Sequence, residues 1–276
     1  MLSKEKQDLL NKIKEHERLG LFDVDVNDDP PSKELLPNMV DYECKKLSSK
    51  CKRFIANFIA DRYFKRLIKK DILVIDGIEN ELILEDALKN GAIITCNHFS
   101  AFDNYIVFHS IRKYLPKKNL YKIIREGNYT SFPGLFGFFF RNCNTLPLSS
   151  NYKTMMKFFK SCNNLLKQGE SILVYPEQAM WWNYKKPRPF KIGAFKIAYK
   201  ANVPIIPLFI SMKDDTRLDN DNYPIQRHTL HVLDPIYPNI KNNEKEETKR
   251  LLDITFNKYK EKYEEVYKEK LTYGKE

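Results

Sequence analysis

The stretch from Ala92 to Asp103 constrains the possible folds most. An unbroken apolar run, Ala92–Cys96, is typical of a strand that is buried on both faces. The run stops at a polar turn, residues 97–100, and a helical pattern begins directly after it. Similar strand patterns alternate with helical ones along the chain, at 120–124, 171–175 and 203–210. The sequence therefore predicts an α/β fold, in which a mixed, mostly parallel central sheet is flanked by helices.

Two side chains of this turn have the chemistry of a catalytic pair. The imidazole of His98 can take a proton from an alcohol, and the carboxylate of Asp103 can keep one ring nitrogen protonated. The same residues also fit a purely structural role. Ser100 and Asp103 have the spacing of a capping box, in which the carboxylate only closes the start of a helix. Both interpretations remain open from this stretch alone.

Composition limits the class of protein and its partners. The net charge of +11 and the pI of about 9.2 predict an anionic partner: a phosphate-bearing substrate, an anionic lipid or nucleic acid. Five cysteines without a CxxC pair favour reduced thiols in a cytosolic setting. The longest apolar run, Phe132–Phe140, is much shorter than the roughly 18 residues of a membrane span.

The length of 276 residues fits one large domain with an extension. We expect residues 1–70 to form an N-terminal helical extension, and residues 71–276 to form the main domain. Within the extension, residues 51–70 have an apolar stripe and a strongly basic polar face. Such a helix can pack on its own domain or lie in an anionic membrane interface, and the sequence slightly favours packing.

Two later stretches combine aromatic and basic residues. Phe132–Phe140 ends in Arg141, which fits an apolar lining for an acyl chain beside a phosphate-binding arginine, or an arginine facing solvent. Glu177 follows a buried strand, where α/β sheets place functional residues. After it come Trp181 and Trp182 and a basic loop with Lys185, Lys186, Arg188 and Lys191, which suits a phosphate site at an interface or a solvated positive loop.

Four blocks in order resemble those of the lysophospholipid (1-acyl-glycerol-3-phosphate) acyltransferases. Asn97–Asp103 resembles the NHxxxxD block, Gly137–Arg141 the glycine-to-arginine block, Tyr175–Glu177 the start of the third block, and Val203–Pro207 the VPxxP block. The resemblance spans residues 75 to about 240. It implies an acyltransferase domain over residues 71–276, with a thioester donor, acyl-CoA or acyl carrier protein, and a lysophospholipid acceptor, most simply 1-acyl-sn-glycerol 3-phosphate. It implies no metal or other cofactor.

The resemblance also assigns roles. His98 would be the general base and Asp103 the residue that orients it. The expected substrate-binding set is Asn97, Arg141, Glu177, Lys185, Lys186, Arg188 and Lys191. The expected location is cytoplasmic, peripheral on the inner face of the cell membrane, with residues 51–70, Phe132–Phe140 and Trp181–Trp182 as candidates for attachment. No nucleic-acid motif appears, so no nucleic-acid partner is expected.

One departure affects the acceptor. The family's third block usually continues Gly-Thr-Arg after the glutamate, and this chain has Gln178, Ala179 and Met180. Either the basic loop replaces the missing arginine, or the acceptor is a different lysolipid, a glycolipid or another hydroxyl compound. The remaining alternatives are an esterase or thioesterase that uses water with the same His-Asp pair, and a non-catalytic basic protein that binds phosphate surfaces.

Overall fold

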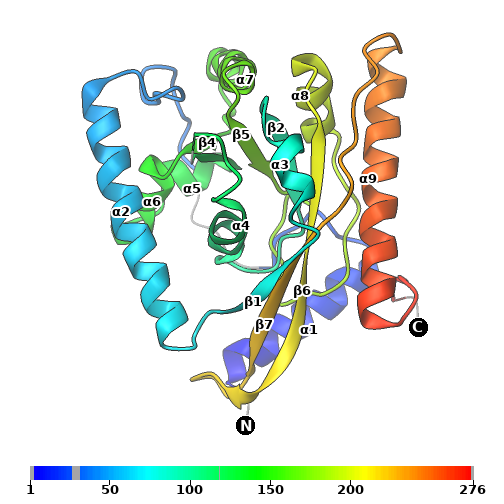
Figure 1. Cartoon of the computed structure of the whole chain (residues 1–276). Coiled ribbons are helices and arrows are strands. Elements are labelled where there is room, and N and C mark those ends of the chain that lie inside the picture. The colour runs from blue at the N-terminus through cyan, green and yellow to red at the C-terminus, as the bar shows by residue number, and fades with distance from the viewer. Residues whose placement is uncertain (1–2, 27–31, 118, 275–276) are drawn as a thin grey trace.

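The computed structural model describes residues 3–26, 32–117 and 119–274, and Figure 1 shows their arrangement. The strands are β1 (Val74–Glu79), β2 (Ala92–Cys96), β3 (Leu120–Ile124), β4 (Thr145–Pro147), β5 (Ser171–Val174), β6 (Ile205–Leu218) and β7 (Pro224–Val232). The helices are α1 (Lys4–Leu19), α2 (Leu47–Lys69), α3 (Ile83–Ala87), α4 (Asp103–Ile111), α5 (Glu126–Thr130), α6 (Gly134–Asn142), α7 (Tyr152–Lys167), α8 (Gly193–Ala201) and α9 (Glu244–Tyr267).

In this part of the chain the strands form one sheet, in the order β1-β7-β6-β2-β5-β3-β4. Only the β6–β7 pair is antiparallel, so the predicted mixed, mostly parallel sheet is confirmed. All five residues of β2 are buried, as expected for a central strand with parallel neighbours on both sides. Helices α7, α8 and α9 cover one face of the sheet, and α3 and α4 cover the other (Figure 1).

The connections from β2 and β5 create a crevice between these two neighbouring strands. From β2 the chain crosses over α4 to β3 on one face, and from β5 it crosses over α8 to β6 on the other face. Because the two connections leave on opposite faces, the carboxyl ends of β2 and β5 are left open between them. The residues that follow these two strands, 97–100 and 175–178, therefore meet at this edge of the sheet.

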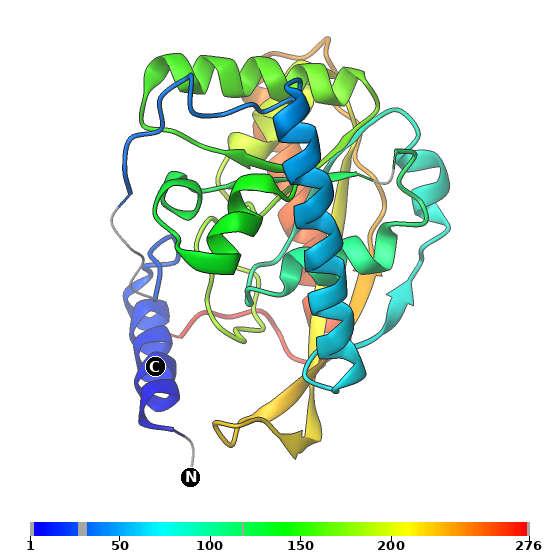
Figure 2. The same ribbon diagram turned by 90° about the vertical axis from the view of Figure 1, so that its left-hand side faces the viewer.

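The segments before β1 pack on the sheet domain in two places. Helix α2 runs along α6 on the outside of the molecule, as Figure 2 shows. Its second half packs on the domain, where the Phe64 ring stacks on that of Tyr105 at 4.4 Å. In its first half Phe54 and Phe58 are 75% and 56% exposed. Ala56 in the same half is fully buried against Phe139 and Cys143, so the packing expected for this helix is confirmed for one face of both halves. The division at residue 70 stays a prediction.

Helix α1 covers the loop that follows β5. Trp181 is completely buried against His16 and Phe22, and its indole N–H donates to the Val24 carbonyl at 2.8 Å. The expectation that Trp181 helps attach the protein to a membrane is therefore wrong. Its ring instead packs against a segment that lies more than 150 residues earlier in the chain.

Strand β6 is longer than the short central strand expected over residues 203–210. Its first half, to Met212, is buried, and its second half continues as an exposed hairpin with β7. Charged residues in that second half (Lys213, Asp214, Asp215 and Arg217) hid the extension from the apolar pattern. Among the described helices, none is both long enough and apolar enough to cross a membrane.

Gly91 gives a test of how tightly β2 is held. It has φ +81°, and a Cβ there would lie 2.5 Å from the Leu166 carbonyl oxygen and 2.9 Å from that of Glu170. We predict that Gly91→Ala lowers the free energy of unfolding in urea by about 3 kcal/mol, from strain plus the clash. Gly20→Ala is the matched control, because Gly20 has φ +70° and open space around it, so only strain of about 1 kcal/mol is added. Equal losses of unfolding free energy in the two variants would contradict the close approach of Gly91 to the Leu166 and Glu170 carbonyls.

Candidate active site

The His98 side chain lies at the carboxyl end of β2 with Asp103 beside it. The Nδ1 atom of His98 lies 2.8 Å from Oδ2 of Asp103, and the Asp103 side chain is fully buried. Because a carboxylate accepts hydrogen bonds, Nδ1 carries the proton and donates it. Nε2 is then left as the basic nitrogen, on a ring that lines the main cavity. The predicted pair is therefore brought together in the geometry that a general base needs.

The capping role of Asp103 is also present in the structure. Its Oδ2 atom accepts the backbone N–H groups of Phe99 at 2.9 Å and Ser100 at 3.0 Å. The carboxylate thus closes the turn before α4 and holds the imidazole with the same oxygen. The two interpretations of the sequence are not alternatives, since one side chain meets both demands.

Tyr175 fixes the plane of the imidazole from the other side. The rings of His98 and Tyr175 stack with centroids 4.1 Å apart at 18°. The Tyr175 hydroxyl donates to Oδ1 of Asn104 at 3.3 Å, which ties β5 to the first turn of α4. Burial raises the pKa of Tyr175 well above its usual value, so it remains a neutral packing surface for the histidine.

Glu177 and Arg188 form a buried ion pair behind the histidine turn. Arg188 donates to Oε2 of Glu177 through Nη2 at 2.7 Å, and the two side chains are 0% and 2% exposed. Nε also donates to Glu177, Nη1 donates to the Phe22 carbonyl, and Nη2 is shared with the carbonyls of His98 and Ala179. The His98 N–H donates to the same Glu177 carboxylate at 3.3 Å. The pair therefore joins the turns after β2 and β5 through both backbone groups of His98.

The Asn97 side chain hydrogen-bonds to the backbone of the neighbouring strand β6. Its amide donates to the Ile210 carbonyl at 3.0 Å and accepts the Ile210 N–H at 2.8 Å, which continues the pairing of β2 with β6 beyond Cys96. The structure places this amide among backbone groups and outside the lining of the cavity. Its predicted contact with substrate stays a prediction.

The predicted basic residues are not gathered at one point. Arg141 is exposed, donates to the carbonyls of Tyr129 and Phe132, and lies outside the cavity lining. The loop lysines each have an acidic partner: Lys185 with Asp214, Lys186 with Glu17 and Lys191 with Asp23. Of the basic residues in the predicted set, Lys191 alone lines the cavity. Its hydrogen bond holds the pKa of Asp23 below the usual value.

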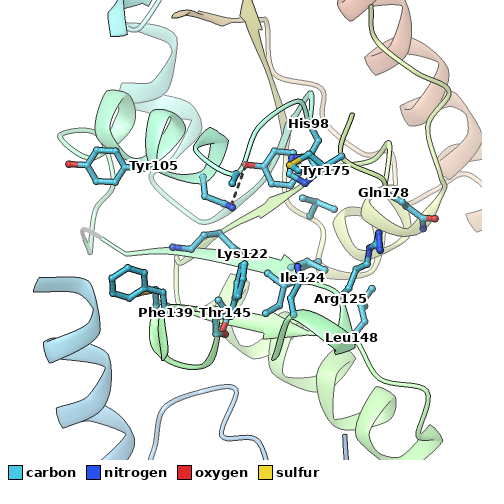
Figure 3. Close-up of a pocket in the computed structure, with 18 of the residues that line it drawn as sticks. His98, Tyr105, Lys122, Ile124, Arg125, Phe139, Thr145, Leu148, Tyr175 and Gln178 are labelled. Carbon is cyan, nitrogen blue, oxygen red and sulfur yellow. Dashed lines mark hydrogen bonds between the residues drawn. The ribbon is translucent and has the colours of Figure 1, made fainter. Parts of the chain in front are cut away.

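A cavity of about 1240 Å³ opens in front of His98. Figure 3 shows His98 and Tyr175 at its edge, with Tyr105 and Phe139 toward one end and Arg125 and Gln178 toward the other. Phenylalanines of the predicted apolar run form much of one wall (Phe132, Phe136, Phe139 and Phe140). The cavity thus combines an apolar part, a basic nitrogen and a polar end.

The polar end contains residues that the sequence analysis did not select. Arg125, at the end of β3, lines the cavity and is ion-paired with Asp25, and Asp25 also accepts the Met180 N–H at 2.9 Å. Lys122 extends from β3 into the apolar part, where burial lowers the pKa of its ammonium. The position of Arg125 in the sequence could have indicated it, because Arg125 follows a predicted strand whose end lies at the same edge of the sheet as His98. Among the described residues, no group of three or more His, Cys, Asp or Glu is placed to hold a metal ion.

Comparisons with known proteins agree with this architecture. Residues 76–211 match the model of the Acyltransferase family. The match includes all four sequence blocks, so the resemblance to an acyltransferase family is confirmed.

A 1-acyl-sn-glycerol-3-phosphate acyltransferase of Chlamydomonas reinhardtii is 27% identical over 116 residues, which are 42% of this chain and 32% of that protein. This chain thus matches about a third of the relative's length. The fold is similar to that of the 1-acyl-sn-glycerophosphate (LPA) acyltransferase PlsC from Thermotoga maritima, with a TM-score of 0.53 and 16% identity. That superposition covers 98% of this chain and 100% of the other.

The buried ion pair can be tested by unfolding. We predict that Arg188→Met lowers the free energy of unfolding by about 3 kcal/mol, because it leaves the Glu177 carboxylate buried without its main partner. Glu177→Gln in the same chain should recover part of that loss, since the uncompensated charge is gone. Urea unfolding of the two single variants and the double variant measures this coupling. Lys249→Met, which removes one partner of an exposed ion pair with Asp253, is the control. Additive losses at Glu177 and Arg188 would contradict the coupling.

Proposed function

We propose that this protein moves a fatty acyl group from a thioester, acyl-CoA or an acylated carrier protein, to the hydroxyl of a glycerol-phosphate lipid. The acceptor in its simplest form is 1-acyl-sn-glycerol 3-phosphate, and the product is then phosphatidic acid. The observation that carries the proposal is the His98–Asp103 pair at the edge of the apolar cavity. The family match of residues 76–211 supports the reaction type.

The reaction follows from the tautomer that Asp103 selects. Nε2 of His98 takes the proton of the acceptor hydroxyl as the oxygen attacks the thioester carbonyl carbon. The carbonyl oxygen bears negative charge in the tetrahedral intermediate. When the intermediate collapses, the C–S bond breaks and the new C–O ester bond remains. The thiolate then takes the proton back from the imidazolium, and Asp103 stabilises that imidazolium while it exists.

The two ends of the cavity divide the substrates between them. The phenylalanines of α6 and the loop before it provide an apolar wall for an acyl chain. At the other end Arg125 and Lys191 provide cations for the acceptor's phosphate, each held in place by an aspartate of the loop 23–25. In this proposal Arg188 acts on substrate only through its hold on the His98 turn, because its side chain is fully buried and lies outside the cavity lining.

We also propose that the protein works as a peripheral protein on the inner face of the cell membrane, with α2 as its contact. Apolar side chains are exposed on the first half of α2 and on α6 beside it (Leu47, Phe54, Ile55, Phe58, Ile59, Leu135 and Phe136). Phe136 also lines the cavity, so the exposed apolar surface is continuous with the proposed acyl site. Basic residues border it on α2 (Arg62, Lys65, Arg66 and Lys69), which suits an anionic lipid surface.

The first test measures release of free thiol from palmitoyl-CoA and from an acylated carrier protein. The acceptors are lysophosphatidate, glycerol 3-phosphate, lysophosphatidylcholine and monoacylglycerol. We expect release that depends on lysophosphatidate, and a loss of about a thousandfold in rate in His98→Ala, because the general base is gone. Asp103→Asn should also lose most activity, since it changes the tautomer of His98.

His109→Gln is the control, because His109 lies on α4 outside the cavity lining. Release without any acceptor would make the protein a thioesterase. A wild-type rate in His98→Ala would overturn the assignment of the base.

The second test measures sedimentation with phosphatidylglycerol vesicles. We predict that replacing Phe54 and Phe58 together by serine weakens binding at least tenfold, because both exposed rings lose their apolar burial in lipid. Replacing Tyr237 and Ile240 by serine is the control, since both are similarly exposed and lie in the loop before α9, across the molecule from α2 (Figure 1). Equal binding by both double variants would exclude α2 as the contact.

A further inference from the structure

Gln178 has a backbone conformation that glutamine rarely adopts. Its φ is +66°, in the left-handed region, where a side chain crowds the following carbonyl oxygen. Most other described non-glycine residues with positive φ are asparagines, which tolerate this region. In the family resembled by this chain, glycine usually stands at this position. The chain therefore keeps a strained side chain where a strain-free residue would fit the backbone.

The surrounding turn imposes this conformation. The Gln178 N–H donates to the Tyr175 carbonyl at 3.1 Å, which closes a tight turn after β5. The residue before it, Glu177, is fixed by the buried ion pair, and Ala179 after it is buried and accepts a hydrogen bond from Arg188. Because both flanks are fixed by buried contacts, the strain at Gln178 cannot relax locally.

The Gln178 side chain is free to meet a ligand. It is exposed, lines the cavity, and its amide has no hydrogen-bond partner among residues 3–26, 32–117 and 119–274. Figure 3 places it toward the same end of the cavity as Arg125. Asp25, the ion-pair partner of Arg125, accepts the N–H of Met180, which links Arg125 to the segment two residues after Gln178. An unused donor and acceptor thus stand at the polar end of the cavity.

We propose that Gln178 is a specificity-determining residue, whose side-chain amide hydrogen-bonds the oxygens of the acceptor's head group. The inference rests on the acyl transfer proposed above and deepens it. A residue that costs stability at a cavity wall, and has no partner in the protein, is explained by a contact with substrate. An amide both donates and accepts, so it matches hydroxyl and phosphate oxygens of a glycerol-phosphate head.

Three variants separate the strain from the contact. Gln178→Ala removes the amide and keeps the strain, whereas Gln178→Gly removes both. Lys268→Gly is the matched control for strain, because Lys268 is an exposed, non-asparagine residue with φ +58° at the end of α9, far from the cavity lining. Thermal unfolding and steady-state kinetics with each acceptor and with the thioester are measured for all three.

We expect Gln178→Gly and Lys268→Gly to raise the midpoint of thermal unfolding by about 2–4 °C, and Gln178→Ala to leave it nearly unchanged. Both Gln178 variants should raise the acceptor KM about fivefold, through the lost hydrogen bond, with the thioester KM unchanged. They should also narrow the difference in kcat/KM between lysophosphatidate and monoacylglycerol. Lys268→Gly should change no kinetic constant.

An unchanged acceptor KM and preference in both Gln178 variants, with wild-type transfer intact, would overturn this inference and leave the proposed function standing. Stabilisation by Lys268→Gly without stabilisation by Gln178→Gly would show that the turn is not strained and would overturn it as well. No acceptor-dependent transfer by the wild-type protein would overturn the proposed function, and this inference with it.

Discussion

The ion pair between Glu177 and Arg188 is the constraint on which the site depends. A charge removed from water is costly unless it is paired and hydrogen-bonded, so neither residue can be buried without the other. The guanidinium also satisfies carbonyls from three separate segments, at Phe22, His98 and Ala179. The N-terminal extension, the turn after β2 and the turn after β5 are thereby held together. The position of His98 is a consequence of this buried pairing as much as of the sheet.

The topology of the sheet determines where this ion pair can position a catalytic residue. The chain leaves β2 and β5 on opposite faces, so the edge between them is the one place where two loops face each other with open space in front. His98 and Glu177 occupy that edge, one from each loop. On one side the crevice continues between α4 and α6, whose rings enclose the apolar part of the cavity. Topology therefore supplies the location, and local hydrogen bonds supply the orientation of the base.

Features that depend on neighbours in the sequence could be predicted from it. The buried run Ala92–Cys96, and His98 with Asp103 five residues later, are local patterns, and the structure brings that pair together. Features that depend on distant partners could not be predicted. The loop of Lys186 and Lys191 reads as an unbalanced positive charge, because its acidic partners Glu17 and Asp23 lie almost 170 residues earlier. The expected exposure of Trp181 is wrong for the same reason, since His16 of the distant helix α1 packs on its ring.

These distant acids change what the polar end of the cavity can recognise. Asp23 and Asp25 pair with Lys191 and Arg125, so both cations of the polar end already have a carboxylate partner before any ligand binds. When an anionic head group binds, the cation exchanges its carboxylate partner for the phosphate. The net electrostatic gain is therefore smaller than it would be for an unpaired cation. Discrimination between head groups must rest more on neutral hydrogen bonds of fixed direction. An unpaired amide on a backbone that cannot move, as at Gln178, is suited to that task.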